Sequence, residues 1–203
     1  MIITFEGGEG SGKGTQIELL EEALVSMGRD VLSIIEPGGT PTGQAIRDVL
    51  LNRKELEILG VTEAFLFSAS RSQQVRTVVR PALAEGKIVI SDRSFYSTYA
   101  YQGYAREGNL ELIATLTELA VGDTKPNLVI LLDLPPEVGL ARKQNQNEIN
   151  RLDAEKLPFH RRVREGYLTL AEQRSDFWVV IDATLLIEQV HKLVLEFVLS
   201  HLD

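Results

Sequence analysis

The chain has 203 residues, which is enough for one ordinary domain with a sizeable buried core. Its 21 Lys and Arg residues against 29 Asp and Glu residues give a formal net charge of −8, which argues against a dedicated nucleic-acid-binding protein. The chain contains no cysteine, so disulfides, zinc–thiolate sites and thiol catalysis are excluded.

Short apolar strands alternate with helical patterns along the chain. In chain order, strands are predicted at residues 2–5, 31–35, 87–91, 128–134 and 178–181. Helical patterns are predicted at residues 13–28, 41–52, 61–84, 95–121, 136–174 and 184–201, with interruptions at 103–108 and 144–150. Five apolar strands, all expected to be buried, predict an α/β fold: a three-layer sandwich with a five-stranded parallel sheet and helices on both faces.

The organisation predicts one domain over residues 1–203 and no membrane partner. No apolar run reaches the roughly 18 to 20 residues that a membrane span requires. The N-terminus has no basic start followed by a long apolar stretch, so we expect a cytoplasmic protein. The amide-rich segment 144–150 predicts a mobile loop.

The first predicted strand is followed by Gly-Gly-Glu-Gly-Ser-Gly-Lys at residues 7–13, which opens the first helix. Glycines let backbone N–H groups converge on an anion, the helix N-terminus adds its positive end, and Lys13 adds a mobile charge. This strand, loop and helix predict a P-loop NTPase-type fold that binds ATP. The expected ATP-binding residues are Gly7, Gly8, Glu9, Gly10, Ser11, Gly12, Lys13, Gly14 and Thr15.

Gly14 stands where such loops usually carry a Ser or Thr that reaches Mg²⁺. We therefore expect Mg²⁺ to be held mainly through phosphates and water, with Thr15 or Asp92 as a candidate protein ligand. The chain has no Asn-Lys-x-Asp run for reading guanine, and it is short for an ATPase motor. A small-molecule kinase is the favoured interpretation.

Asp92 and Arg93 end the third predicted strand and are expected at the carboxyl edge of the sheet, beside the phosphate loop. An arginine there can bridge donor and acceptor phosphates, which makes Arg93 a catalytic candidate with Lys13. The alternative is a salt bridge at the strand end.

Four further segments complete a pattern with the phosphate loop. They are Glu-Pro-Gly-Gly-Thr at 36–40, Phe-Ser-Ala-Ser-Arg at 67–71, Asp-Arg with Ser-Thr-Tyr-Ala-Tyr-Gln-Gly at 92–103, and Phe-His-Arg-Arg-Val-Arg-Glu-Gly-Tyr at 159–167. In order and spacing the chain resembles bacterial thymidylate kinases over nearly its whole length. The resemblance implies transfer of the γ-phosphoryl group of ATP to dTMP, giving dTDP and ADP in dTTP biosynthesis. It also implies a homodimer formed through the helices near 41–84.

The resemblance implies roles for residues around the base. Phe67 would stack on thymine, and Arg71 would meet a base carbonyl. Gln102 and Thr98 would complete the base edge, and Tyr101 would crowd the sugar 2′ position. Helical spacing alone favours a core position for Phe67, and the resemblance reverses that interpretation. The alternatives are buried packing for Tyr101 and a surface arginine for Arg71.

The remaining implied dTMP-binding residues surround the sugar and phosphate. Glu9 would face the acceptor sugar, and Arg47 and Arg93 would clamp the acceptor phosphate. Glu36 would hold the acceptor region, and Ser70 belongs to the same set. Arg47 has the alternative of a solvated helix face.

In this family a catalytic arginine comes from the phosphate loop or from a lid, here placed at about 142–152. The phosphate loop has no arginine, and the middle of the lid carries amides, so the basic residues stand at its edges. The hypothesis is that Arg142, Lys143 or Arg151 takes the catalytic role, with Arg142 favoured. The alternative is that these basic residues form a solvated hinge, in which case phosphoryl transfer would be slower.

Two other functions stay open at this point. Gly-Lys-Gly-Thr-Gln at 12–16 resembles the loop of adenylate kinases, so another nucleoside monophosphate kinase is one. A non-catalytic nucleotide sensor is the other, because the lid is poor in arginine.

Overall fold

The computed structural model describes residues 1–144, 150–174 and 176–202. Its strands form one sheet in the order β2-β3-β1-β4-β5, and every neighbouring pair is parallel. The strands are β1 (Ile2–Glu6), β2 (Val31–Ile35), β3 (Ile88–Asp92), β4 (Leu128–Asp133) and β5 (Trp178–Asp182). The prediction of a five-stranded parallel sheet is confirmed.

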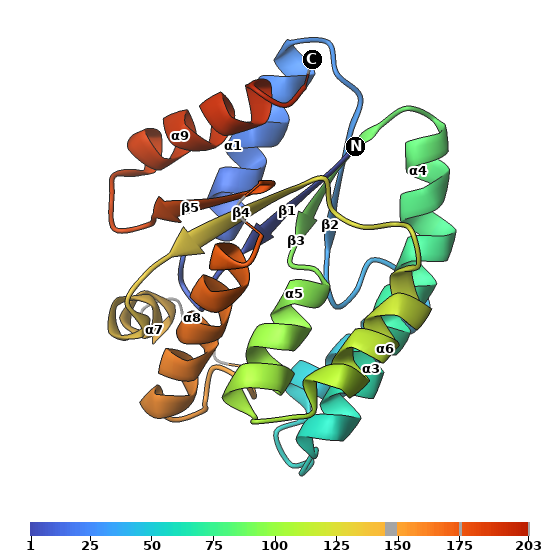
Figure 1. Cartoon of the computed structure of the whole chain (residues 1–203), viewed down its shortest axis with the longest axis vertical. Helices are drawn as coiled ribbons and strands as arrows, with labels where there is room; N and C mark the ends of the chain where they lie inside the picture. The colour runs from blue at the N-terminus through green and yellow to red at the C-terminus, as the bar shows by residue number, and fades with distance from the viewer. Residues whose placement is uncertain (145–149, 175, 203) are drawn as a thin grey trace.

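The helices fill the connections between the strands (Figure 1). They are α1 (Lys13–Ser26), α2 (Pro41–Arg47), α3 (Gly60–Gln74), α4 (Arg80–Ala84), α5 (Phe95–Thr98), α6 (Leu110–Val121), α7 (Pro136–Gln144), α8 (Leu157–Glu172) and α9 (Ile187–Leu199). In the described part of the chain, π-helical segments continue α2, α3 and α5, namely η1 (Asp48–Asn52), η2 (Val75–Val79) and η3 (Tyr99–Ala105). Among the described residues, no helix combines the length and the apolarity needed to cross a membrane.

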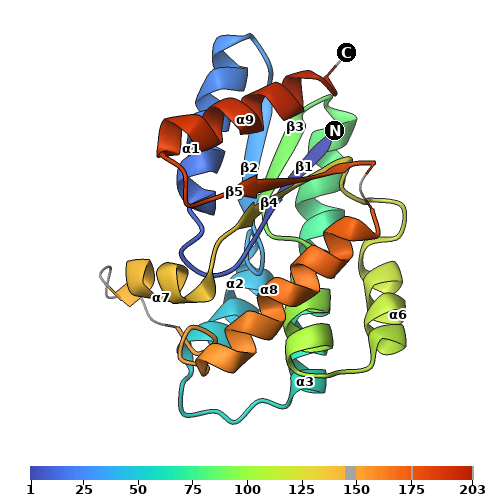
Figure 2. The ribbon, with the colours of Figure 1, turned by 60° about the vertical axis from the view of Figure 1, so that its left-hand side comes forward.

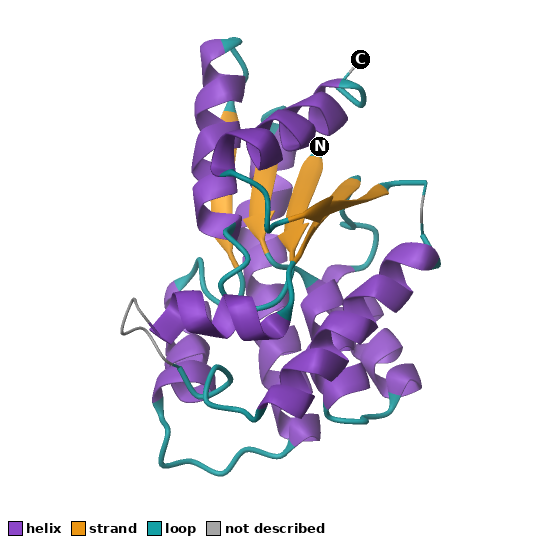
Figure 3. Ribbon diagram, turned by 90° about the vertical axis from the view of Figure 1, so that its left-hand side faces the viewer, coloured by secondary structure: helices purple, strands orange, loops and turns teal. Residues whose placement is uncertain are grey.

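Helices cover both faces of the sheet, as Figure 3 shows with the strands between them. Side chains alternate along each strand, so Ile3 and Phe5 of β1 pack with α1 and α9, whereas Ile2 packs on the opposite face with η2 and α4. All three are buried, and this is why apolar residues stand on both faces of the strand. The three-layer α/β fold is therefore the observed one.

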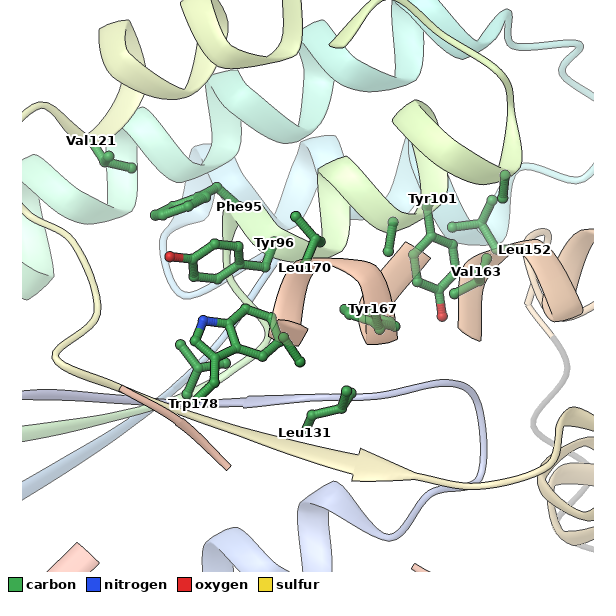
Figure 4. Packing of buried hydrophobic residues seen from close by; sticks show 14 of the residues in the cluster. Phe95, Tyr96, Tyr101, Val121, Leu131, Leu152, Val163, Tyr167, Leu170 and Trp178 are labelled. Atoms are coloured by element: carbon green, nitrogen blue, oxygen red, sulfur yellow. The ribbon is translucent and has the colours of Figure 1, made fainter. Parts of the chain in front are cut away.

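An aromatic cluster joins the sheet to the helices of the second face (Figure 4). The ring of Trp178 on β5 meets Tyr96 of α5 edge-on, with centroids 4.8 Å apart. Tyr96 in turn packs against Phe95 at 4.3 Å. Tyr101 and Tyr167 lie edge to face at 6.3 Å, further along the same layer. Together with Val129 and Leu131 of β4, these contacts pack α5, η3 and α8 against β4 and β5.

Two details of the prediction are wrong. The strand at 31–35 is half-buried, with Ile35 40% exposed, because β2 is an edge strand that pairs with β3 alone. The helix expected to resume after residue 150 begins at Leu157. Residues 150–156 instead form turns, in which Asn150 Oδ1 accepts hydrogen bonds from the backbone N–H groups of Leu152 and Asp153.

Candidate active site

A cleft of about 880 Å³ lies beyond the carboxyl ends of the strands. Figure 2 shows α7, which follows β4, at this same end of the sheet. The cleft brings together predicted residues from well-separated segments of the chain. They are Glu9, Gly10, Ser11, Gly12, Lys13, Gly14, Thr15, Glu36, Arg47, Phe67, Asp92, Arg93, Thr98, Tyr101, Gln102, Arg142 and Lys143.

The phosphate loop folds around the side chain of Lys13. Its Nζ donates to the backbone oxygens of Gly7 and Gly8, each at 3.2 Å. Gly10 and Gly12 have φ values of 66° and 88°, a left-handed conformation that glycine adopts without strain. Burial lowers the pKa of the Lys13 ammonium group, and the nearby charge of Arg93 acts in the same direction. Gly7 and Gly8 thus support the lysine from behind the wall of the cleft.

Helix α7 packs directly on the phosphate loop. A Cβ atom on Gly10 would lie 2.2 Å from the backbone oxygen of Gly139, so neither glycine has room for a side chain. Arg142, one turn after Gly139, donates from Nη1 to the backbone oxygens of Gly10 and Ala183, both at 3.3 Å. Gly139 was not predicted from the sequence, although a glycine inside a short helical pattern signals close packing.

Arg93 is the most constrained cation of the site. Its φ of 74° is unusual for a residue with a side chain, which points to a position held by its surroundings. Nη2 donates to Glu9 Oε1 at 2.9 Å, and Nη1 donates to the backbone oxygen of Gly7 at 3.1 Å and to the hydroxyl of Tyr167 at 3.1 Å. Arg93 therefore bridges the phosphate loop and α8.

Glu9 sits between Arg93 and Tyr101, whose hydroxyl donates to Oε1 at 2.6 Å. Burial by itself would raise the pKa of this carboxyl. The charges of Arg93 and Lys13, with the Tyr101 hydrogen bond, outweigh burial and lower the pKa to about 2. Glu9 is consequently an ionised acceptor at neutral pH.

Glu6 is a fully buried carboxylate that the sequence analysis missed. It accepts hydrogen bonds from the backbone N–H of Ser94 at 2.8 Å and from the hydroxyls of Ser94, Ser97 and Tyr167 at 2.7, 2.7 and 2.9 Å. Burial raises its pKa, against the effect of these bonds and of Arg93. The only signal in the sequence is a charged residue at the end of an otherwise apolar strand.

The opposite wall is built on the Glu36–Arg71 ion pair. Arg71 Nε donates to Glu36 Oε2 at 2.6 Å, and Nη1 donates to the hydroxyl of Thr98 at 3.2 Å. Burial raises the pKa of Glu36, and Arg71 counteracts this. Glu36, Thr98 and the ring of Phe67 line the cleft, whereas Arg71 lies behind them. Ser70 also lies away from the wall, where its hydroxyl accepts from the backbone N–H of Gly38.

A second buried carboxylate, Glu63, was also missed. It accepts from Gln102 Nε2 at 3.0 Å, and it forms ion pairs with Arg106 and Arg151 at 3.0 and 2.7 Å. Arg151 is therefore turned toward Glu63 and does not line the cleft. Lys143 lines the cleft and pairs with Asp153 at 3.3 Å. Residues 145–149, the middle of the predicted lid and most of the predicted mobile loop, lie outside the described residues.

The end of the cleft beside the phosphate loop has an apolar lining that sequence reasoning did not find. Its residues follow β5 and start α9, namely Ala183, Leu185, Ile187 and Val190. Gln16 ties α1 to this segment by donating to the backbone oxygen of Ile187 at 3.0 Å. A flat apolar group attached to a phosphate chain fits this arrangement.

The phosphate loop follows β1, and Arg93 follows the neighbouring strand β3 and faces that loop. This arrangement is typical of P-loop nucleotide kinases. The family model for thymidylate kinase matches residues 5–194. Relatives called thymidylate kinase are 42% identical in Sulfurihydrogenibium sp. (strain YO3AOP1), over 96% of this chain and 95% of the relative, and 43% identical in Geobacillus sp. (strain WCH70), over 100% and 97%. A third, from Maridesulfovibrio salexigens, is 45% identical over 95% of this chain and 92% of the relative. The chain belongs to the thymidylate kinase family, and it is an ATP-dependent nucleotide kinase.

The ionised state of Glu9 generates a prediction about stability. Because the pKa is about 2 in the folded chain and 4.5 in the reference state, its contribution is complete above about pH 4.5 and is lost as pH falls toward 2. We expect Glu9→Gln to lower the free energy of unfolding at pH 7 on the order of 2 kcal/mol. The difference from the wild type should shrink between pH 4.5 and 3 in urea denaturation curves. A difference that is equal at pH 7 and pH 3 would contradict it.

Proposed function

We propose that this chain transfers the γ-phosphoryl group of ATP to dTMP, giving dTDP and ADP for dTTP biosynthesis. Membership of the thymidylate kinase family supports this function. The observation that carries it is the place of Arg93, which contacts the phosphate loop through Gly7 and the acceptor side of the cleft through Glu9. A group in that position contacts both nucleotides at the point of transfer.

The two substrates occupy the two ends of the cleft in this proposal. ATP lies along residues 7–15, with its base against the apolar segment before α9. dTMP lies on the other side of Arg93, with its base beside Phe67 and Gln102 and its sugar beside Glu9 and Tyr101. Arg47, whose Nη1 donates to the backbone oxygen of Pro37 at 2.8 Å, serves the acceptor phosphate with Arg93.

The reaction is an in-line displacement without a covalent intermediate. An acceptor phosphate oxygen is already anionic, so a strong general base is unnecessary. The role of the protein is to position the phosphates and to stabilise the charge that develops on the transferring group. Lys13, Arg93 and Arg142 are the proposed catalytic cations, since all three line the cleft around the phosphate loop.

The reaction class generally needs a divalent metal ion, and we propose Mg²⁺, held mainly through phosphates and water. Asp92 and Thr15 are the candidate protein ligands because both line the cleft. Asp92 Oδ1 is buried without a hydrogen-bond partner among the described residues, which fits a role toward a hydrated cation. The ion, when bound, neutralises phosphate charge.

We also propose a cytoplasmic homodimer that uses the helices near 41–84. Val61 and Phe65, one turn apart on α3, are 48% and 51% exposed, so together they form an apolar patch that a partner chain would cover. Light scattering should therefore give twice the chain mass at micromolar concentration. A monomer under those conditions would contradict this proposal.

One assay tests the function directly. Purified protein with Mg²⁺ and ATP should convert dTMP to dTDP at a higher kcat/KM than it converts AMP or CMP. A preference for AMP or CMP would instead identify another nucleoside monophosphate kinase. Tight binding of ATP and dTMP without dTDP formation would identify a nucleotide sensor.

Alanine variants test the catalytic arginine. We expect Arg142→Ala to lower kcat by roughly 10³-fold with little change in the KM for dTMP, because the lost charge acts on the transferring group. The matched control is Arg161→Ala, an exposed arginine on α8 that pairs with Glu137, and it should keep normal turnover. If Arg142→Ala, Lys143→Ala and Arg151→Ala all keep near-normal turnover, the hypothesis that a basic residue at the edge of the lid is catalytic is wrong.

A further inference from the structure

The buried carboxylate of Glu63 has no part in the function described so far. It lies on α3 with no exposed surface, beneath the wall that carries Gln102. Two guanidinium groups, from Arg106 and Arg151, are paired with it, and Gln102 Nε2 donates to its Oε2 at 3.0 Å. A carboxylate with two cationic partners offers only acceptor atoms.

This bond decides which way the Gln102 amide faces. The NH₂ group must point to Glu63, because two oxygens in contact would repel each other. The carbonyl oxygen Oε1 has no hydrogen-bond partner within residues 1–144, 150–174 and 176–202, and Gln102 lines the cleft. The polar atom available to a ligand there is thus an acceptor.

We propose that Glu63 is a positioning residue that makes the acceptor site select a pyrimidine with an N3–H group, by holding Gln102 Oε1 toward the base. The inference rests on the proposed placement of the dTMP base beside Gln102. Thymine and uracil carry a hydrogen on N3 and can donate to this oxygen. Cytosine has a lone pair there, so its binding would set two acceptors against each other without a proton between them.

The geometry around Glu63 identifies a substitution that should reverse the orientation of the Gln102 amide. Arg106 Nη2 and Arg151 Nη1 both contact Oε1, at 3.0 and 2.7 Å, while Oε2 accepts from Gln102 Nε2 at 3.0 Å and from Arg106 Nε at 3.3 Å. In Glu63→Gln the amide oxygen keeps the two shorter arginine contacts, and the new NH₂ group faces Gln102 and displaces the longer contact of Arg106 Nε. Gln102 then has to turn its own oxygen toward position 63 and present its NH₂ group to the base.

The experiment compares kcat/KM for dTMP, dUMP and dCMP in the wild type and in Glu63→Gln. The ratio of dCMP to dTMP should rise roughly tenfold or more, since a donor now faces N3. The ratio of dUMP to dTMP should stay unchanged, because both bases keep N3–H. A purely structural role for Glu63 would lower activity on all three alike, and unchanged ratios would overturn the proposal.

Arg106→Gln is the matched control. It removes one charge from the same network but leaves the Gln102–Glu63 hydrogen bond, so it should keep the wild-type ratio of dCMP to dTMP. If Glu63→Gln does not fold, Gln102→Met, which removes both amide groups, should raise that ratio as well. Wild-type discrimination in Gln102→Met would overturn the inference. Phosphorylation of dTMP by the wild type would still support the proposed function.

Discussion

The site depends on the hydrogen bonds that hold Arg93 in one place. A guanidinium at the end of β3 is anchored to Glu9, to the backbone oxygen of Gly7 and to the hydroxyl of Tyr167. Tyr167 is itself fixed by Glu6, on the adjacent strand. Preorganised charge stabilises a transition state without reorganising at the moment of reaction, so this rigidity suits the catalytic role that we propose for Arg93.

The same construction recurs around the cleft and explains how an acidic chain can bind two polyanions. Arg71 is held by Glu36, and Arg151 is held by Glu63. A net charge of −8 is thus compatible with phosphate binding, because these pairs neutralise carboxylates around the cleft while Lys13, Arg93 and Arg142 line it. Removing one partner of such a buried pair would leave an uncompensated charge, so neither residue of a pair can be replaced alone without destabilising the fold.

Local patterns predicted the strands, the phosphate loop and the strand-end Arg93, because glycine spacing and apolar periodicity are properties of neighbouring residues. The acceptor-side residues of the cleft, such as Phe67 and Gln102, were predicted from the resemblance to thymidylate kinases. Glu6 and Glu63 were missed because their partners are distant in the chain: Glu6 bonds Tyr167 across 161 positions, and Glu63 bonds Gln102 across 39. The half-buried edge strand β2 was missed for a related reason, since strand order is set by topology. Arg142 and Arg151 both stand at the edges of the predicted lid, so the sequence does not distinguish them. In the folded chain Arg151 pairs with Glu63, whereas Arg142 contacts the phosphate loop.

The anchors of Arg93 leave part of its guanidinium available. Its hydrogen-bond partners among the described residues contact Nη1 and Nη2, and none contacts the Nε edge. A phosphate can therefore bind along that edge without breaking the bonds to Glu9 and Gly7. Gln102 follows the same principle, with its NH₂ group held and its oxygen available. In both cases a carboxylate fixes one side of a planar group, and the other side is available to a ligand.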